Sequence, residues 1–113
     1  MTWIIAGSLA IFITVVHGWL GATKVVSPVN GITPPLKRIL HAIFFLSAVY
    51  WAAAGLGLIL LAGSADDPRR ALVGWVALAI FLSGAAANAW ATRGRHFGWM
   101  LLALTSGLTV AGL

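Results

Sequence analysis

Three histidines are the residues of this chain best suited to chemistry. His17 and His41 each sit just inside an apolar run, on either side of one connection, and His96 lies at the mouth of the last apolar run. Neutral imidazole is the commonest metal ligand in proteins and can bind haem iron axially. Ionisable residues inside a membrane are also candidates for proton relays and ligand contacts. These positions therefore form the candidate site.

The segments that carry the histidines are apolar and long enough to cross a bilayer. Of 113 residues, 61% are hydrophobic and 8% are charged, whereas a soluble domain carries about 25% charged residues. A helix of about 20 apolar residues spans a hydrocarbon core of about 30 Å. We expect one integral membrane domain over residues 1–113, an all-α four-helix transmembrane bundle. Its helices are expected at about 2–22, 39–63, 71–92 and 97–113.

Counting helical rise places the histidines at one depth. His17 lies about five residues before the end of the first segment and His41 about three after the start of the second, roughly 5–8 Å below one membrane surface. Asn88 comes out at a similar depth. These residues predict a metal pair of His17 and His41, with His96 and Asn88 completing a site for haem, a metal ion or a quinone head group. Alternatively, the histidines are interfacial side chains hydrogen-bonded to each other, to Asn88 or to a loop carbonyl.

Other side chains in the apolar segments suggest packing. Tyr50 and Trp51 fall mid-segment, where they either pack between helices or form a wall for a flat ligand. Small residues recur every four positions in three segments, a spacing that lets a neighbouring helix approach closely. We expect all three stripes to make helix contacts inside the bundle. They are Ala6, Ala10, Thr14, Gly18 and Ala22; Ala79, Ser83, Ala87 and Ala91; and Ala103, Gly107 and Ala111.

The connection over 23–38 is expected to be a long loop. It contains Pro28, Asn30-Gly31 and Pro34-Pro35, and proline removes a backbone donor and disfavours helix in the residue before it. Its basic residues, with those near His96, surround the candidate site and would attract an anionic lipid head group or substrate.

The chain lacks the side chains on which several classes of function depend. No cysteine is present, which excludes disulfides, iron–sulfur clusters and thiolate metal sites. No Ser/His/Asp set, carboxylate pair or phosphate loop appears, so we expect no enzyme. The net charge of +5 comes from basic residues between apolar runs, and we interpret these as orientation signals and not as a nucleic-acid surface.

The size and four-span plan resemble the small multidrug resistance exporters. Those proteins carry a glutamate in the first helix, where this chain has only Thr14 and His17, so the resemblance extends to architecture alone. The motifs HGWLG, LKRILH and RGRHFGW resemble a loose group of small bacterial four-span membrane proteins. That resemblance draws attention to His17, His41 and His96 and implies no established activity.

Three functions remain open from the sequence. The first is a non-catalytic accessory or structural subunit of a larger membrane assembly, whose partners are the lipid bilayer and either other membrane subunits or a second copy. The second is a haem-, metal- or quinone-binding membrane protein that uses the histidine cluster. The third is a small dimeric transporter.

The distribution of charge predicts the orientation. The first and third connections hold five basic residues and no acids, and the second holds two of each. Lys and Arg favour the cytoplasmic side, so we expect a bacterial inner-membrane protein with both termini extracytoplasmic and the segment starting MTWII retained as a span. Trp3 and Trp75 should mark one interface, and Trp19, Trp90 and Trp99 the other.

Cysteine labelling tests this orientation. A cysteine at Ser64 should react with a membrane-impermeant thiol reagent added to intact cells, and a cysteine at Asn30 should react only after permeabilisation. The chain has no native cysteine, so each variant reports one position. The reverse labelling pattern would overturn the topology.

Overall fold

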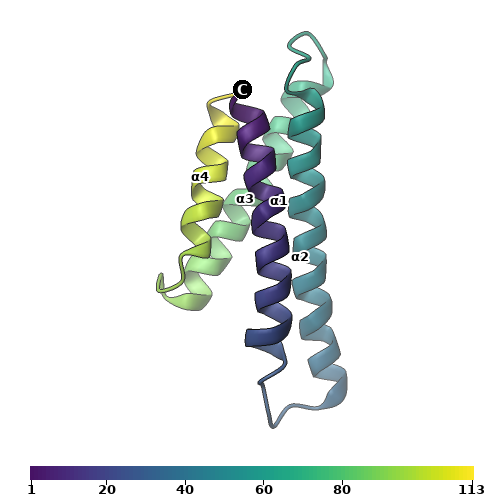
Figure 1. Cartoon of the computed structure of the whole chain (residues 1–113), viewed down its shortest axis with the longest axis vertical. Helices are drawn as coiled ribbons and strands as arrows, with labels where there is room; N and C mark the ends of the chain where they lie inside the picture. Colours follow the sequence, from purple (N-terminus) through teal and green to yellow (C-terminus); the bar gives the residue numbers. More distant parts are fainter.

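The computed structural model describes all 113 residues, and the fold is an all-α bundle of four helices (Figure 1). The expected fold class is confirmed. Helices α1, α2 and α3 are long and apolar enough to cross a membrane, whereas α4 is a shorter apolar helix. The elements are α1 (Thr2–Leu20), which continues into a π-helix η1 (Gly21–Val26), α2 (Pro34–Leu61), α3 (Arg69–Thr92) and α4 (Gly98–Val110).

Successive helices run antiparallel around a single core. Helices α1 and α3 each pack against both α2 and α4, which gives the up-down arrangement of Figure 1. The hairpin formed by α1 and α2 continues well past the turn between α3 and α4, and the first connection closes its far end. We call this the basic end of the bundle, because Lys24, Lys37 and Arg38 lie there.

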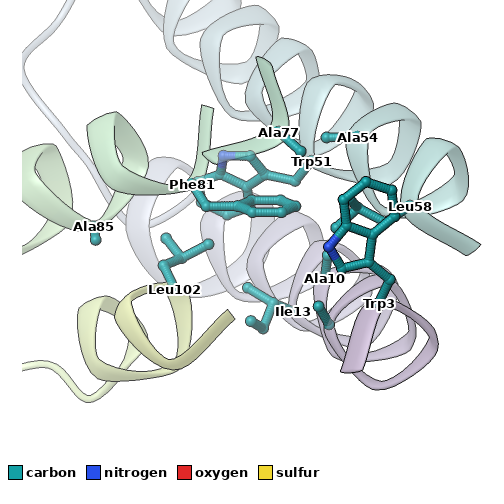
Figure 2. Packing of buried hydrophobic residues seen from close by; sticks show 11 residues of the cluster. Trp3, Ala10, Ile13, Trp51, Ala54, Leu58, Ala77, Phe81, Ala85 and Leu102 are labelled. Carbon is teal, nitrogen blue, oxygen red and sulfur yellow. The ribbon is translucent and has the colours of Figure 1, made fainter. Parts of the chain in front are cut away.

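Large side chains from all four helices meet in the core (Figure 2). Small residues between them allow the helices to approach one another, so that aromatic rings fill the remaining space. The core consists of Trp3, Ala6, Ala10 and Ile13 of α1; Trp51, Ala54 and Leu58 of α2; Ala77, Phe81 and Ala85 of α3; and Leu102 of α4.

Part of the small-residue stripe of α1 lies in a helix contact: the Cβ of Ala10 lies 3.0 Å from a Cβ added to Gly55 of α2, and Gly7, next to the stripe, lies in the same contact. A Cβ added to Gly7 would overlap the carbonyl oxygen of Gly55 in α2, and a Cβ added to Gly55 would lie 2.8 Å from the carbonyl oxygen of Gly7. Farther along α1, the Thr14 hydroxyl lies 2.9 Å from the carbonyl oxygen of Ala10 and 3.4 Å from that of Ala48. The two backbones therefore touch where both helices lack side chains.

The stripes predicted for α3 and α4 do not pack inside the bundle. A Cβ added to Gly107 would meet nothing within 4 Å. The inward face of α3 instead carries Phe81, which belongs to the same core cluster as Trp51, and the buried Leu78. The stripe of α3 therefore lies on the outer surface, which also exposes Val76 and Leu82, while the inward face combines Phe81 with the small residues Ala77 and Ala85. The exposed stripe residues are Ala79, Ser83, Ala87 and Ala91 of α3 and Ala103, Gly107 and Ala111 of α4.

Trp3 is a core residue and not the interface marker that the sequence suggested. It is 1% exposed, and its indole N–H donates to the carbonyl oxygen of Thr109 at 2.9 Å. This bond joins the first turn of α1 to the last turn of α4. Trp19, Trp75 and Trp90 remain exposed, as interfacial tryptophans should be.

Arg70 joins all four helices at the end opposite the basic end. Its guanidinium lies 3.9 Å from the centroid of the Trp3 ring and donates to the carbonyl oxygens of Leu61 at 2.6 Å and Gly112 at 2.8 Å. The final carbonyls of a helix lack partners and carry partial negative charge, so a cation there is favourable. In the sequence, Arg70 is only one of the two basic residues of the second connection, and nothing there predicts these contacts.

The first connection is more helical than expected. Helix α2 begins at Pro34, within the predicted loop, because the first helical positions need no N–H donor. On the other side η1 extends to Val26, so only Ser27–Thr33 lies outside helices. The Lys37 ammonium holds this segment by donating to the carbonyl oxygens of Ser27 at 2.8 Å and Val29 at 3.3 Å.

Two glycine substitutions test the packing. Gly55→Leu should lower the free energy of unfolding by about 2–3 kcal/mol or more, because its side chain has to separate the backbones of α1 and α2. Gly107→Leu should be neutral or slightly stabilising, because the site is open and leucine favours helix more than glycine does. Thermal unfolding in mild detergent measures both. Equal destabilisation would contradict the assigned inward and outward faces.

Candidate functional site

His17 lies in the contact between α1 and α2 and is half-buried. Its ring stacks on Phe44, with centroids 4.9 Å apart and an interplanar angle of 29°. The Trp51 ring lies 4.5 Å away at 54°. His17 Nε2 is 3.4 Å from the Ser47 hydroxyl, which also lies 3.0–3.1 Å from two carbonyl oxygens of its own helix. The surroundings of His17 are therefore mainly aromatic.

The absence of a side chain at Gly21 makes room for the ring of Phe44. The π-helix η1 begins at Gly21, and a side chain there would overlap the Phe44 ring. Phe44 thus packs against the backbone of Gly21 as well as the imidazole of His17. Departures from α-helical hydrogen bonding are frequent near functional sites, and this one lies one turn beyond His17.

His41 is exposed and has different surroundings. It lies at the meeting point of two hollows on the hairpin. One, of about 450 Å³, is bounded by Lys37, Arg38 and the segment 29–34. The other, of about 350 Å³, is mostly apolar and contains Phe44 and Gly18. Because α2 begins earlier than expected, His41 lies two turns into the helix.

His96 and Asn88 come together at the start of α4. His96 Nδ1 accepts the backbone N–H of Gly98 at 3.1 Å, and its ring stacks on Phe97 with centroids 4.8 Å apart. Both His96 Nδ1 and Asn88 Nδ2 lie within 3.5 Å of where a Cβ on Gly98 would stand. The buried Oδ1 of Asn88 has no hydrogen-bond partner. Asn88 and His96 thus share one small polar region.

The predicted site residues therefore occupy distinct local settings: the α1–α2 contact, the rim of the hairpin, and the start of α4. No group of three or more His, Cys, Asp or Glu side chains is placed to hold a metal ion. Ligation by His17 and His41 alone stays a prediction. Trp51 is 5% exposed and is covered by His17 and Gly84, which favours packing over a ligand wall, and Tyr50 is exposed.

The histidine-bearing end has no protein counter-charge. The only salt bridge joins Arg69 to Asp67 at 2.7 Å, in the turn at the opposite end. Hydrogen bonds from Arg69 lower the pKa of Asp67 to about 2. Asp66 and Asp67 are the only acids of the chain, so none lies near the basic end.

Sequence reasoning missed Phe44 and Ser47 as the partners of His17 on α2. Phe44 and Ser47, which contact His17, lie three residues apart on α2 and so share one helix face. This spacing would have placed them near the same contact, but three- and four-residue spacing alone does not tell which neighbour a side chain meets.

Alanine substitutions separate the roles of the two histidines. His17→Ala should lower the free energy of unfolding by about 1–3 kcal/mol, because it removes a ring packed on two aromatic rings. His41→Ala should change it by less than about 0.5 kcal/mol, because the side chain is exposed. Thermal unfolding in detergent measures both, and equal effects would contradict the distinction.

The ligation hypothesis makes a different prediction. Either alanine variant should then release most of the bound metal or haem, and the double variant should lose little more, since the ligands act as one unit. Metal analysis and the absorption spectrum of gently purified protein measure this. Colourless, metal-free wild-type protein would overturn the metal and haem hypotheses.

Comparison with known proteins adds no assignment: no protein family, curated protein or solved structure matches this chain.

Proposed function

We propose that this protein is a non-catalytic subunit of a larger membrane assembly, and that the outer faces of α3 and α4 receive a transmembrane helix of another polypeptide. The supporting observation is the outward direction of the small-residue stripes on these two helices. The same spacing on α1 accompanies backbone contact with α2. In a membrane, surfaces of this kind allow helices to pack closely.

The outward faces of α1 and α2 offer a contrast. They carry a dense set of large apolar side chains, which suit contact with lipid tails. These exposed residues are Ile4, Ile5, Ile11, Phe12 and Val15 of α1 and Ile39, Ile43, Phe45, Leu46, Val49, Leu56 and Leu60 of α2. Helices α3 and α4 also expose large apolar side chains, Val76, Leu82 and Leu104 among them, but they add the small-residue stripes, which favour a partner on the α3–α4 side.

The length of α4 gives a second, independent argument. Its 13 residues rise about 20 Å, which is less than a hydrocarbon core of about 30 Å. A short apolar helix is accommodated by local thinning of the bilayer, by flanking side chains that reach the interface, or by association with another helix. A partner beside α3 and α4 would cover the basic turn Arg93–His96.

The remaining parts of the proposal concern location. We place the protein in a bacterial inner membrane with the basic end in the cytoplasm and both termini outside, on the charge asymmetry of its connections. The partner would then meet the basic turn on the cytoplasmic side.

Photocrosslinking in native membranes tests the partner. Gly107→Cys, carrying a thiol-attached photocrosslinker, should give an adduct of discrete mass with a second polypeptide. Leu60→Cys is the control, because this exposed α2 residue lies toward the same end of the bundle but belongs to the bulky face. Adding Leu at Ala87 to the Gly107→Cys variant should reduce the adduct, since a bulky side chain keeps the partner helix away.

Three results would overturn the proposal. These are equal adducts from both cysteine positions, labelling of lipid alone from Gly107→Cys, and an adduct whose mass corresponds to two copies of this chain. The last result would assign the α3–α4 face to self-association.

A further inference from the structure

Two hollows of opposite chemistry meet at His41. The first, near the start of α2, is lined by polar and cationic groups. The second follows along α2 toward the centre of the bundle and is lined by Phe44, Phe45 and small residues. His41 contributes to both. A molecule occupying both hollows needs a polar, negatively charged end and an apolar end.

The polar hollow presents positive charge at the basic end of the bundle, where the first connection meets the start of α2. Lys37, Arg38 and His41 line it together with the Asn30-Gly31 turn. Lys37 also donates to the carbonyl oxygens of the connection, so the hollow has a fixed wall. The exposed Arg38 guanidinium has no hydrogen-bond or salt-bridge partner in the protein. A phosphate would supply both the missing acceptor oxygens and the missing charge.

The apolar hollow owes its space to small residues. It lies between α1 and α2 and is bounded by Gly18, Ala22 and Ala48 together with the two phenylalanines. A Cβ added to Gly18 would meet nothing within 4 Å. Its volume of about 350 Å³ and its apolar lining suit part of an acyl chain, because each methylene removed from water contributes about 0.8 kcal/mol.

The basic residues at this end have no acidic partner within the protein. Lys24, Lys37 and Arg38 of the first connection and Arg93 and Arg95 of the third have no carboxylate near them, since both acids lie in the opposite turn. Anionic lipids attract basic segments at the membrane surface with about 1 kcal/mol per residue. Diffuse attraction of this kind acts on all five cations, whereas the two hollows mark one position.

We propose that the hairpin of α1 and α2 binds one anionic phospholipid at this position. Its phosphate lies in the polar hollow beside Arg38 and His41, and the upper part of an acyl chain lies in the apolar hollow against Gly18 and Phe44. This site is on the opposite half of the bundle from the proposed partner surface of α3 and α4, so either proposal stands without the other.

The experiment uses the full chain in a neutral mild detergent, with phosphatidylglycerol and phosphatidylcholine of identical acyl chains as probes. Native mass spectrometry counts retained lipid, and thermal unfolding reports stabilisation. Phosphatidylglycerol should bind with one-to-one stoichiometry and raise the unfolding temperature, whereas phosphatidylcholine should do neither. Arg38→Gln should weaken binding about tenfold, a loss expected for one charge-assisted contact. Arg93→Gln removes the same charge outside the site and should leave binding nearly unchanged.

A second pair of variants tests the apolar part. Gly18→Leu fills the hollow and should weaken phosphatidylglycerol binding about tenfold, while its unfolding temperature without lipid stays near that of the wild type. Gly107→Leu is the matched control on the other half of the bundle. Equal weakening by Arg38→Gln and Arg93→Gln would show diffuse attraction and overturn the proposal. Equal binding of both lipids, or full stabilisation by inorganic phosphate alone, would also overturn it.

Discussion

The close approach of α1 and α2 at Gly7 and Gly55 is the constraint on which the rest of the structure depends. Lipid tails are as apolar as the helices, so helix association in a membrane relies on packing and interhelical hydrogen bonds. Backbone contact at these glycines brings the two helices together, and the contacts of Thr14 with Ala48 and of Gly21 with Phe44 continue it along α1 and η1. It thereby places the His17 ring against Phe44 and Trp51 and leaves the hollow beside Gly18.

The two ends of the bundle differ in whether their charged groups find partners within the protein. At one end Arg70 supplies a cation to the terminal carbonyls of α2 and α4 and lies against Trp3, so helix ends and charge satisfy one another within the protein. At the other end the cations face outward with no acid nearby. Lys37 is partly used to hold the connection, and Arg38 is not. The contacts of Arg70 stabilise the fold at the first of these ends, whereas the basic end is available to anionic molecules.

The lateral surfaces of the two halves of the bundle also differ. Helices α1 and α2 expose bulky apolar side chains and carry the paired hollows. Helices α3 and α4 expose stripes of small side chains among larger ones such as Leu82 and Leu104, and a short basic turn joins them. The proposed lipid site and the proposed partner surface therefore lie on separate faces. This division agrees with the proposed role, in which one side of the bundle contacts lipid and the other a neighbouring polypeptide.

The sequence by itself determined the class of protein, its helices and the gathering of basic residues between them, because hydropathy, segment length and charge are properties of the chain. Helical rise also suggested a common depth for His17, His41 and Asn88. Only the tertiary structure decided the inward faces of α3 and α4, the burial of Trp3 and the role of Arg70. The reason is that a membrane helix is apolar on every side, so its pattern does not distinguish a face toward protein from a face toward lipid. Depth follows from counting residues, whereas position around the bundle depends on which large side chains interlock.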